Sequence, residues 1–411
     1  MSANRKILYI TYDGMTDPLG QSQILPYLTN LSRQGYRFTI LSCEKRERYK
    51  KYNSIIREIT VAYNIEWEPL WFSTKPPVLS KFFDALKMRR KALQLQRRKK
   101  FDMVHCRSYI AADIGWMLKK RYGIKFLFDM RGFWADEKKD AGSWPQDKFL
   151  YRKVYNYYKK KEAGFLQHAD HIISLTNAGK KEMLSWNAYN SNIPLTVIPC
   201  CADMNHFSVT DIFQKNKSRV LLKINKDRFV VSYLGSVGAW YMLDEMLEMF
   251  RYIKKKFPQA LFLFITHSSP DQIKSAAARK DISLSDLLIV EATREEVPLF
   301  AKASDISVSF IKPVYSKISS SPTKLGELLS MGIPVISNDR VGDVEEVICK
   351  SGGGLVIRNF TTEEYEKVTD KIPELLKKDP AEIRNNIRSV FSLDTGTELY
   401  SKVYEQIFAN N

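Results

Sequence analysis

The chain has 411 residues, of which 44% are hydrophobic and 27% charged, and its net charge at pH 7 is +18. A chain of this length exceeds one ordinary domain core, so we expect two domains. No run of about 18 apolar residues occurs, which excludes a membrane-spanning helix. Its first residues lack a signal-peptide layout, and its five cysteines are scattered without a C-x-x-C pair, which predicts a cytoplasmic protein.

Apolar strand-like segments alternate with segments of helical periodicity along almost the whole chain. In the first half we expect strands at 7–11, 37–42, 67–72, 103–105, 125–129, 171–175 and 195–199, with helices at 23–34, 81–99, 110–122 and 150–167. In the second half we expect strands at 229–234, 260–266, 287–290, 306–310 and 334–337, with helices at 242–256, 270–279, 294–303 and 324–331. Two amphipathic helices follow at 380–391 and 395–408.

This alternation predicts an α/β protein with two Rossmann-like domains, each built on a parallel sheet. The pattern relaxes near residue 200, so we place the domains at 1–205 and 206–394, with 395–411 returning to the first. We expect the domains to face one another across a cleft. Ligands of such sheets bind at the carboxyl ends of the strands, so the loops after the strands are the candidate sites.

In the first half, polar residues follow three expected strands. Gly20 lies in an expected turn after the first strand, where a glycine allows close backbone approach. His105 ends the fourth strand, and Asp129 and Arg131 follow the fifth in the segment DMRGFW. A buried Asp–Arg pair that only holds the loop is the alternative to a catalytic role, and His105 is equally compatible with a satisfied buried histidine.

In the second half, the strand at 229–234 runs into a small-residue turn that contains Gly235 and Ser236. Backbone N–H groups there can approach a pyrophosphate. The spacing is neither G-x-G-x-x-G nor a P-loop, which disfavours a nicotinamide cofactor and the common ATPases. No D-x-D or H-E-x-x-H occurs, so we expect no metal and no other cofactor.

The segment SSSPTKLGELLSMGIPVIS, residues 319–337, is the most informative of the chain. A hydroxyl-rich loop leads into a helix N-terminus, which attracts anions. Lys324 adds a positive charge, and Glu327, one turn along, can accept hydrogen bonds from a pair of vicinal hydroxyls. This order suits a nucleoside diphosphate. The alternative is an ordinary capped helix with Glu327 in solvent.

Much of the positive charge lies between residues 81 and 100, where nine Lys or Arg residues accompany the single acid Asp84. Phe82, Leu86 and Leu93 fall near one face of the expected helix, so this reads as a basic amphipathic helix. A solvated outer helix face, with these apolar residues packed on the domain, is the alternative. We expect contact with an anionic membrane surface, and no nucleic acid, because no nucleic-acid-binding motif accompanies the charge.

Six segments in order resemble glycosyltransferases of family 4. They are DPLGQSQ (17–23), FDMRGFW (128–134), VIPCCADMNHF (197–207), LGSVGAWY (234–241), EEVPLFAKASDISVSF (295–310) and the segment that begins at residue 319. The resemblance implies the GT-B fold, with a final helix that crosses back to the first domain. It also implies retaining, metal-independent transfer from a nucleotide-sugar donor on the second domain to a glycan or lipid-linked acceptor on the first.

The loop positions and the resemblance together assign donor binding to Gly20, Gly235, Ser236, Ser319, Ser321, Thr323, Lys324 and Glu327, and catalysis to Asp129, His105 and Arg131. Glu327 matches the glutamate that holds the ribose. Eight positions earlier, Ser319 stands where the family usually has the first of two glutamates, which touches the donor sugar, and Asp129 stands where it often has a histidine. Lys324 is expected to supply the positive charge for the departing diphosphate.

The sequence therefore predicts a cytoplasmic hexosyltransferase, peripheral on the inner membrane, that takes part in surface polysaccharide assembly. Two alternatives stay open. One is a GT-B epimerase or phosphorylase, and the other is a nucleotide-binding partner subunit that has lost catalysis.

Overall fold

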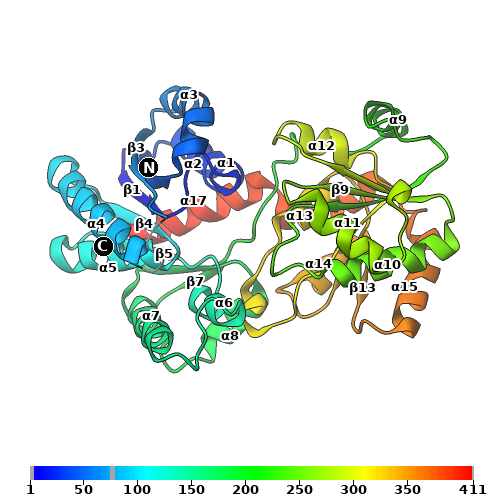
Figure 1. Cartoon of the computed structure of the whole chain (residues 1–411). Helices are drawn as coiled ribbons and strands as arrows, with labels where there is room; N and C mark the ends of the chain where they lie inside the picture. Colours follow the sequence, from blue (N-terminus) through cyan, green and yellow to red (C-terminus); the bar gives the residue numbers. More distant parts are fainter. Residues whose placement is uncertain (1–3, 75–78, 410–411) are drawn as a thin grey trace. The chain divides into compact units, whose positions relative to one another are not determined.

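A computed structural model describes residues 4–74 and 79–409 of the chain (Figure 1). It divides into two compact units: unit 1 is Met1–Pro199 with Leu393–Asn411, and unit 2 is Cys200–Ser392. The sequence had suggested boundaries after residues 205 and 394. Of the described residues, no helix is both long and apolar enough to cross a membrane.

Unit 1 is built on a seven-stranded parallel sheet in the order β3-β2-β1-β4-β5-β6-β7. The strands are β1 (Lys6–Thr11), β2 (Arg37–Glu44), β3 (Glu66–Trp71), β4 (Met103–Arg107), β5 (Lys125–Asp129), β6 (His171–Ser174) and β7 (Leu195–Val197). The helices are α1 (Pro18–Gln23), α2 (Leu25–Arg33), α3 (Arg46–Ala62), α4 (Leu79–Lys99), α5 (Ser108–Tyr122), α6 (Trp134–Asp140), α7 (Phe149–His168), α8 (Asn177–Leu184) and α17 (Leu393–Ala409).

Unit 2 has a six-stranded parallel sheet in the order β10-β9-β8-β11-β12-β13. Its strands are β8 (Phe229–Leu234), β9 (Ala260–Ile265), β10 (Leu287–Val290), β11 (Ile306–Ser309), β12 (Val335–Asn338) and β13 (Gly354–Ile357). Its helices are α9 (Ile212–Leu221), α10 (Leu243–Lys256), α11 (Pro270–Ala278), α12 (Glu296–Ala301), α13 (Thr323–Ser330), α14 (Val344–Ser351), α15 (Thr362–Leu375) and α16 (Pro380–Phe391), with short 3-10 turns at Leu284–Asp286 and Tyr315–Ser319.

Both sheets are buried on their two faces, which is why their central strands are apolar without alternation. In β9, for example, all six residues of ALFLFI are buried. One apolar cluster of unit 2 includes Leu263 and Leu328, and another includes Phe262 and Phe250, so successive side chains of β9 point into different clusters. In both units the strand order reverses beside the first strand, at β1/β4 and at β8/β11. Open parallel sheets bind ligands at such a switch point.

The predicted α/β architecture is confirmed, but the expected elements did not include strand β13 or helices α1, α3, α6, α8, α9, α14 and α15, and two local predictions need correction. The helix expected at 23–34 is α2, which begins at Leu25, because Ile24 leaves the helical conformation with φ −126° and separates α2 from α1. Gly20 lies inside α1 rather than in a turn. Helix α3 was not among the expected helices, and only Ile56 and Thr60 of its 17 residues are buried.

The predicted basic helix is confirmed as α4, and Phe82 and Leu86 do not pack on the domain as the alternative interpretation required. Met88 is fully buried, whereas Phe82 and Leu86 are 60% and 36% exposed. Asp84, the one acid of the helix, is buried and accepts hydrogen bonds from Ser73 and the Tyr12 hydroxyl. The outer surface of α4 therefore combines positive charge with exposed aromatic side chains.

Candidate active site

In unit 2, the first turn of α13 presents backbone N–H groups beside the switch point of the sheet. Pro322 precedes α13, and no side chain caps this end of the helix. The hydroxyl group of Ser321 accepts a hydrogen bond from the Cys200 N–H group at 3.1 Å, which holds the loop before the helix. Thr323 opens the helix and is half-buried. The positive end of the helix dipole is thus available to an anion.

Lys324 is the most unusual side chain of this site. It is only 9% exposed, and its ammonium group lies 3.9 Å from the ring centroid of Tyr241 and 4.3 Å from that of Tyr233. The Tyr233 hydroxyl lies 3.1 Å from the same nitrogen. Burial lowers the pKa of Lys324 to about 7, against an opposing effect of the Glu327 carboxylate. The ammonium group is held by the faces of two aromatic rings and by no carboxylate of the described residues, so its positive charge remains available to pair with an anionic ligand.

Glu327 lies one turn further along α13 and is half-buried. Burial raises the pKa of its carboxyl group to about 7, although the charges of Arg294 and Lys324 lower it. A half-exposed carboxylate one helical turn from the ammonium group suits a ligand with a phosphate followed by vicinal hydroxyls.

The turn after β8 lies directly against Lys324. Gly235 has φ +115°, and a Cβ atom at this position would lie 3.0 Å from the Lys324 ammonium nitrogen. The N–H group of Gly235 donates to the Ile265 carbonyl oxygen, so this donor serves the sheet and not a ligand. Ser236 is exposed. Gly235 therefore acts by making room for the ammonium group.

Ser319 does not face this site through its hydroxyl group. The side chain is 2% exposed and donates to the carbonyl oxygen of Ser316 at 2.8 Å, within the 3-10 turn that precedes α13. A second lysine, which sequence reasoning missed, lies in the same turn: the Lys317 ammonium group is 3.8 Å from the centroid of the Trp240 ring. Lysines spaced seven residues apart on either side of a loop gave no recognisable signal in the sequence.

In unit 1, the three residues assigned to catalysis come together in a buried network. His105 Nδ1 lies 2.7 Å from the Tyr404 hydroxyl, and its Nε2 lies 3.4 Å from Asp129. The Tyr400 hydroxyl donates to the same carboxylate oxygen at 2.9 Å. Both tyrosines belong to α17, so the network joins the final helix to β4 and β5 (Figure 1).

Charge in this network favours ionised Asp129 and neutral His105. Burial opposes ionisation of Asp129, but Arg131, 3.8 Å away, and His105 together hold its pKa below the usual value. Burial lowers the pKa of His105 in spite of Asp129. Arg131 has φ +56°, which is uncommon for a side-chain-bearing residue. Asp129 and His105 are at most 2% exposed, so in this structure both side chains serve the packing of α17.

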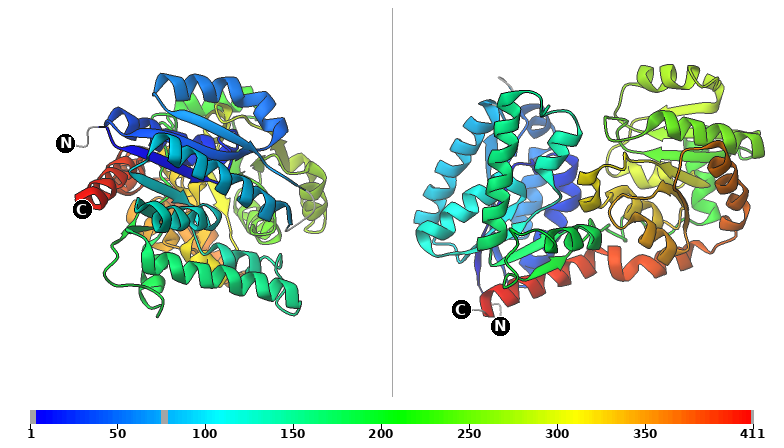
Figure 2. Two further views of the ribbon diagram at one scale, coloured as in Figure 1. Left: turned by 90° about the vertical axis from the view of Figure 1, so that its left-hand side faces the viewer. Right: turned by 90° about the horizontal axis from the view of Figure 1, so that it is seen from below.

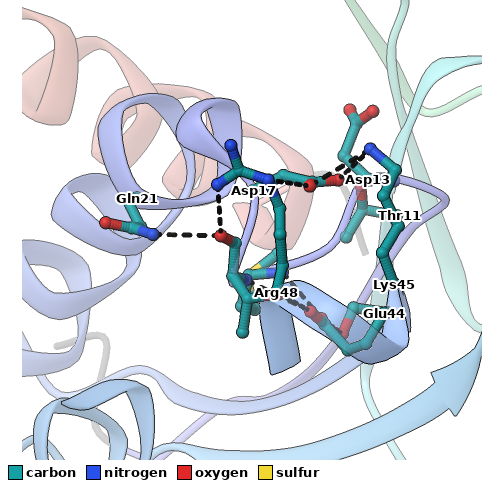
Figure 3. A network of polar contacts seen from close by, with 10 residues as sticks. Thr11, Asp13, Asp17, Gln21, Glu44, Lys45 and Arg48 are labelled. Atoms are coloured by element: carbon teal, nitrogen blue, oxygen red, sulfur yellow. Dashed lines mark hydrogen bonds and ion pairs between the residues drawn. The ribbon is translucent and has the colours of Figure 1, made fainter. Parts of the chain in front are cut away.

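Gly20 contacts protein rather than open space. An added Cβ atom would lie 2.2 Å from the carbonyl oxygen of Gly14, so glycine allows α1 to pack on the loop after β1. This loop is fixed by the buried Glu44 carboxylate, which accepts hydrogen bonds from the N–H groups of Met15 and Thr16 (Figure 3). The Thr16 hydroxyl donates to the same group at 2.5 Å. These hydrogen bonds hold the loop after β1 against β2.

No group of three or more His, Cys, Asp or Glu side chains that could hold a metal ion occurs in the described part of the chain. The positive groups of the unit 2 site are instead Lys324, Lys317 and the α13 N-terminus. Two Rossmann-like units, one of them with a cationic site at its switch point, define a protein of the GT-B class.

Comparisons with known proteins identify the family. Residues 24–206 match the profile described as Glycosyltransferase Family 4, and residues 214–390 match the profile described as Glycosyl transferases group 1. These two ranges together cover most of the chain. The chain therefore belongs to the GT-B glycosyltransferases that combine these two domains. A search of the curated proteins found no match.

Solved structures share the fold over nearly the full length. Sucrose-phosphate synthase from Thermosynechococcus elongatus is 14% identical with a TM-score of 0.76, covering 99% of this chain and all of its own. Anabaena HepE in complex with UDP and glucose is 12% identical with a TM-score of 0.70, covering 98% and 100%. WaaG, a glycosyltransferase involved in lipopolysaccharide biosynthesis, is 14% identical with a TM-score of 0.66, covering 97% and 99%.

Proposed function

We propose that the chain transfers a hexose from a nucleotide-sugar donor to a glycan or lipid-linked acceptor, with retention of anomeric configuration and without a metal ion. The observation that carries the proposal is the unit 2 site, where a buried ammonium group lies beside a helix N-terminus and one turn from a half-buried carboxylate. HepE, of the same fold, has been solved with UDP and with UDP-glucose.

The donor is held by its nucleotide half. Lys324 and the first N–H groups of α13 receive the diphosphate, while Glu327 accepts hydrogen bonds from the ribose hydroxyls. Thr323 and Ser321 line the approach to the helix, and Gly235 and Ser236 form the opposite wall. Breaking the anomeric C–O bond places negative charge on the diphosphate, which these preorganised positive groups stabilise where it develops. The departing phosphate takes the proton of the acceptor hydroxyl that attacks from the same face.

The first of the two family glutamates has no counterpart at Ser319, whose hydroxyl donates to the Ser316 carbonyl oxygen. Specificity for the sugar therefore comes from other groups. Unit 1 binds the acceptor. The network of Asp129, His105 and Arg131 stabilises the carboxyl ends of the strands in this unit and does not transfer a proton.

The protein works in the cytoplasm at the inner membrane surface, in polysaccharide assembly. Support comes from α4, whose only acid is buried while Phe82, Phe83 and Leu86 are exposed beside its basic residues. Part of the charge is paired within unit 1, because Glu68 binds Lys91 and Arg98. Unpaired cations with exposed aromatic rings suit an anionic membrane interface.

Transfer is tested with a panel of radiolabelled nucleotide sugars and a membrane extract as acceptor, with and without EDTA. Product formed equally in EDTA, with the anomeric configuration of the donor by NMR, supports the proposal. Inverted product or dependence on a metal ion contradicts the mechanism. Nucleotide binding without any product supports the alternative of a catalytically inactive partner subunit.

A further inference from the structure

Three helices of unit 1 lie side by side on one face of its sheet: α4, α5 and α7 (Figure 2). Between them is a hollow of about 400 Å³. Its lining residues are Arg89, Asp113, Trp116, Met117, Lys120, Arg121, Tyr157 and Lys161. None of these residues belongs to the donor site of unit 2.

The hollow is strongly positive. Four of its lining residues are cations and only one, Asp113, is an acid. Lys161 binds that acid at 2.6 Å, which leaves Arg89, Lys120 and Arg121 without a carboxylate among the lining residues. A second hollow on α4, lined by Arg90, Leu93, Gln94, Arg97 and Arg98, contains three cations and no acid. Two hollows of the same sign on one helix attract an anion rather than a neutral ligand.

Trp116 gives the first hollow a rigid apolar wall. Gly164 lets α7 approach this ring, since a Cβ atom there would lie 2.5 Å from it. The ring also packs edge-to-face on Phe165, with centroids 5.9 Å apart. The Lys120 ammonium group lies over the same ring at 3.6 Å, and Tyr157 on the other side is 51% exposed. Aromatic side chains that are partly exposed to water and lie beside cationic side chains are typical of a membrane interface.

We propose that this hollow, the α4–α5–α7 pocket, binds the phosphate-bearing headgroup of an anionic membrane lipid. Lys120, Arg121 and Arg89 donate to the phosphate oxygens, and Trp116, Met117 and Tyr157 contact the glycerol and the first acyl carbons. The inference rests on the proposed membrane location and deepens it, because it replaces a general attraction between charges with one defined binding site.

The test uses the full chain and lipids short enough to stay monomeric, so that no charged surface is present. Calorimetric titrations compare dihexanoyl phosphatidic acid, dihexanoyl phosphatidylcholine, glycerol phosphate and inorganic phosphate. We expect the phosphatidic acid to bind at least about tenfold more tightly than each of the others, because only it offers both a phosphate monoester and acyl carbons. Equal binding of inorganic phosphate would assign the pocket to free phosphate and overturn the lipid proposal, as would the absence of binding.

Two variants with the same loss of charge separate the pocket from the general basic surface. Lys120→Ala with Arg121→Ala removes two exposed pocket cations, and Arg152→Ala with Lys153→Ala removes two exposed cations of α7 outside the pocket. We expect the first to weaken binding of the short phosphatidic acid about tenfold or more, and the second to leave it within about twofold. Equal losses contradict a defined site.

Nucleoside diphosphate binding is measured on each variant as an independent readout of the unit 2 site. It stays unchanged in both variants if they fold. If the wild type binds the lipid but no nucleotide, the glycosyltransferase proposal fails and the lipid-pocket proposal is kept. If the wild type binds a nucleotide but no lipid, only the lipid-pocket proposal is rejected.

Discussion

Replacing Lys324 by methionine removes the buried ammonium group while keeping a side chain of similar length. The group lies between the rings of Tyr233 and Tyr241 and no carboxylate is bonded to it in the described residues, so its charge is available to the diphosphate. A charge-assisted contact contributes about 1.5–3 kcal/mol. We therefore expect nucleoside diphosphate to bind about tenfold to more than a hundredfold more weakly to Lys324→Met.

The same substitution changes the pH dependence of binding. The pKa of Lys324 is about 7 in the folded chain and 10.5 ordinarily, so between these values the unfolded chain holds the extra proton. The stability of the ligand-free protein accordingly rises with pH over this range, whereas a ligand that needs the ammonium group binds less tightly above pH 7. Lys324→Met loses both dependences.

Isothermal titration from pH 6 to 9 measures the affinity, and urea titration over the same range measures the stability, with the exposed Lys312→Met as the matched control. The control keeps the affinity and the pH dependence of the wild type. Unchanged affinity of Lys324→Met for every nucleoside diphosphate would refute the reasoning, because the buried cation would then have a structural role only.

Other predictions concern stability and the turn after β8. Asp129→Ala is expected to lower the free energy of unfolding by about 3–5 kcal/mol in urea titrations, since it breaks a buried charged network; a change under about 1 kcal/mol would favour a purely catalytic aspartate. Burial lowers the pKa of His171 from 6.5 to about 4 and also lowers that of His105, so only the unfolded chain takes up these protons. Stability therefore falls from pH 6.5 towards 4, and a His171→Gln variant should show a shallower fall in urea midpoints; an unchanged slope contradicts this. Gly235→Ala strains a backbone of φ +115° and places a Cβ atom close to the Lys324 ammonium group, so we expect weaker nucleotide binding by calorimetry. Wild-type affinity would show that the turn accommodates the added Cβ atom without displacing Lys324.

The sequence predicted the fold well because its elements are strongly patterned. Parallel strands such as β9 are continuous apolar runs, and the turn with Gly235 and the start of α13 follow directly from the order of the elements. Helix α3 was missed because little of it is buried. The sequence left open which apolar residues of α4 are buried, because periodicity locates an apolar stripe without showing whether Phe82 or Met88 packs on the domain.

The unit 1 network shows a different limit. His105, Asp129 and Arg131 were all expected at strand ends, but β4 continues to Arg107, so His105 lies within the strand and pairs in register with Leu127. Tyr400 follows its partner Asp129 by 271 residues and Tyr404 follows His105 by 299, so only tertiary packing brings these side chains together. Their spacing of four residues places them on one helix face, which was the available signal. Gly20 could not be interpreted from sequence either, because its neighbour is backbone of the preceding loop.

The central claim is that unit 2 holds a nucleotide-sugar donor at α13. It is tested most directly by the melting temperature of the wild type and Glu327→Ala against a panel of nucleoside diphosphates and nucleotide sugars. A ligand that binds the native state raises the melting temperature. We predict a rise for one nucleobase in the wild type that is lost or strongly reduced in Glu327→Ala. No rise with any nucleotide, or an equal rise in both proteins, would contradict the account.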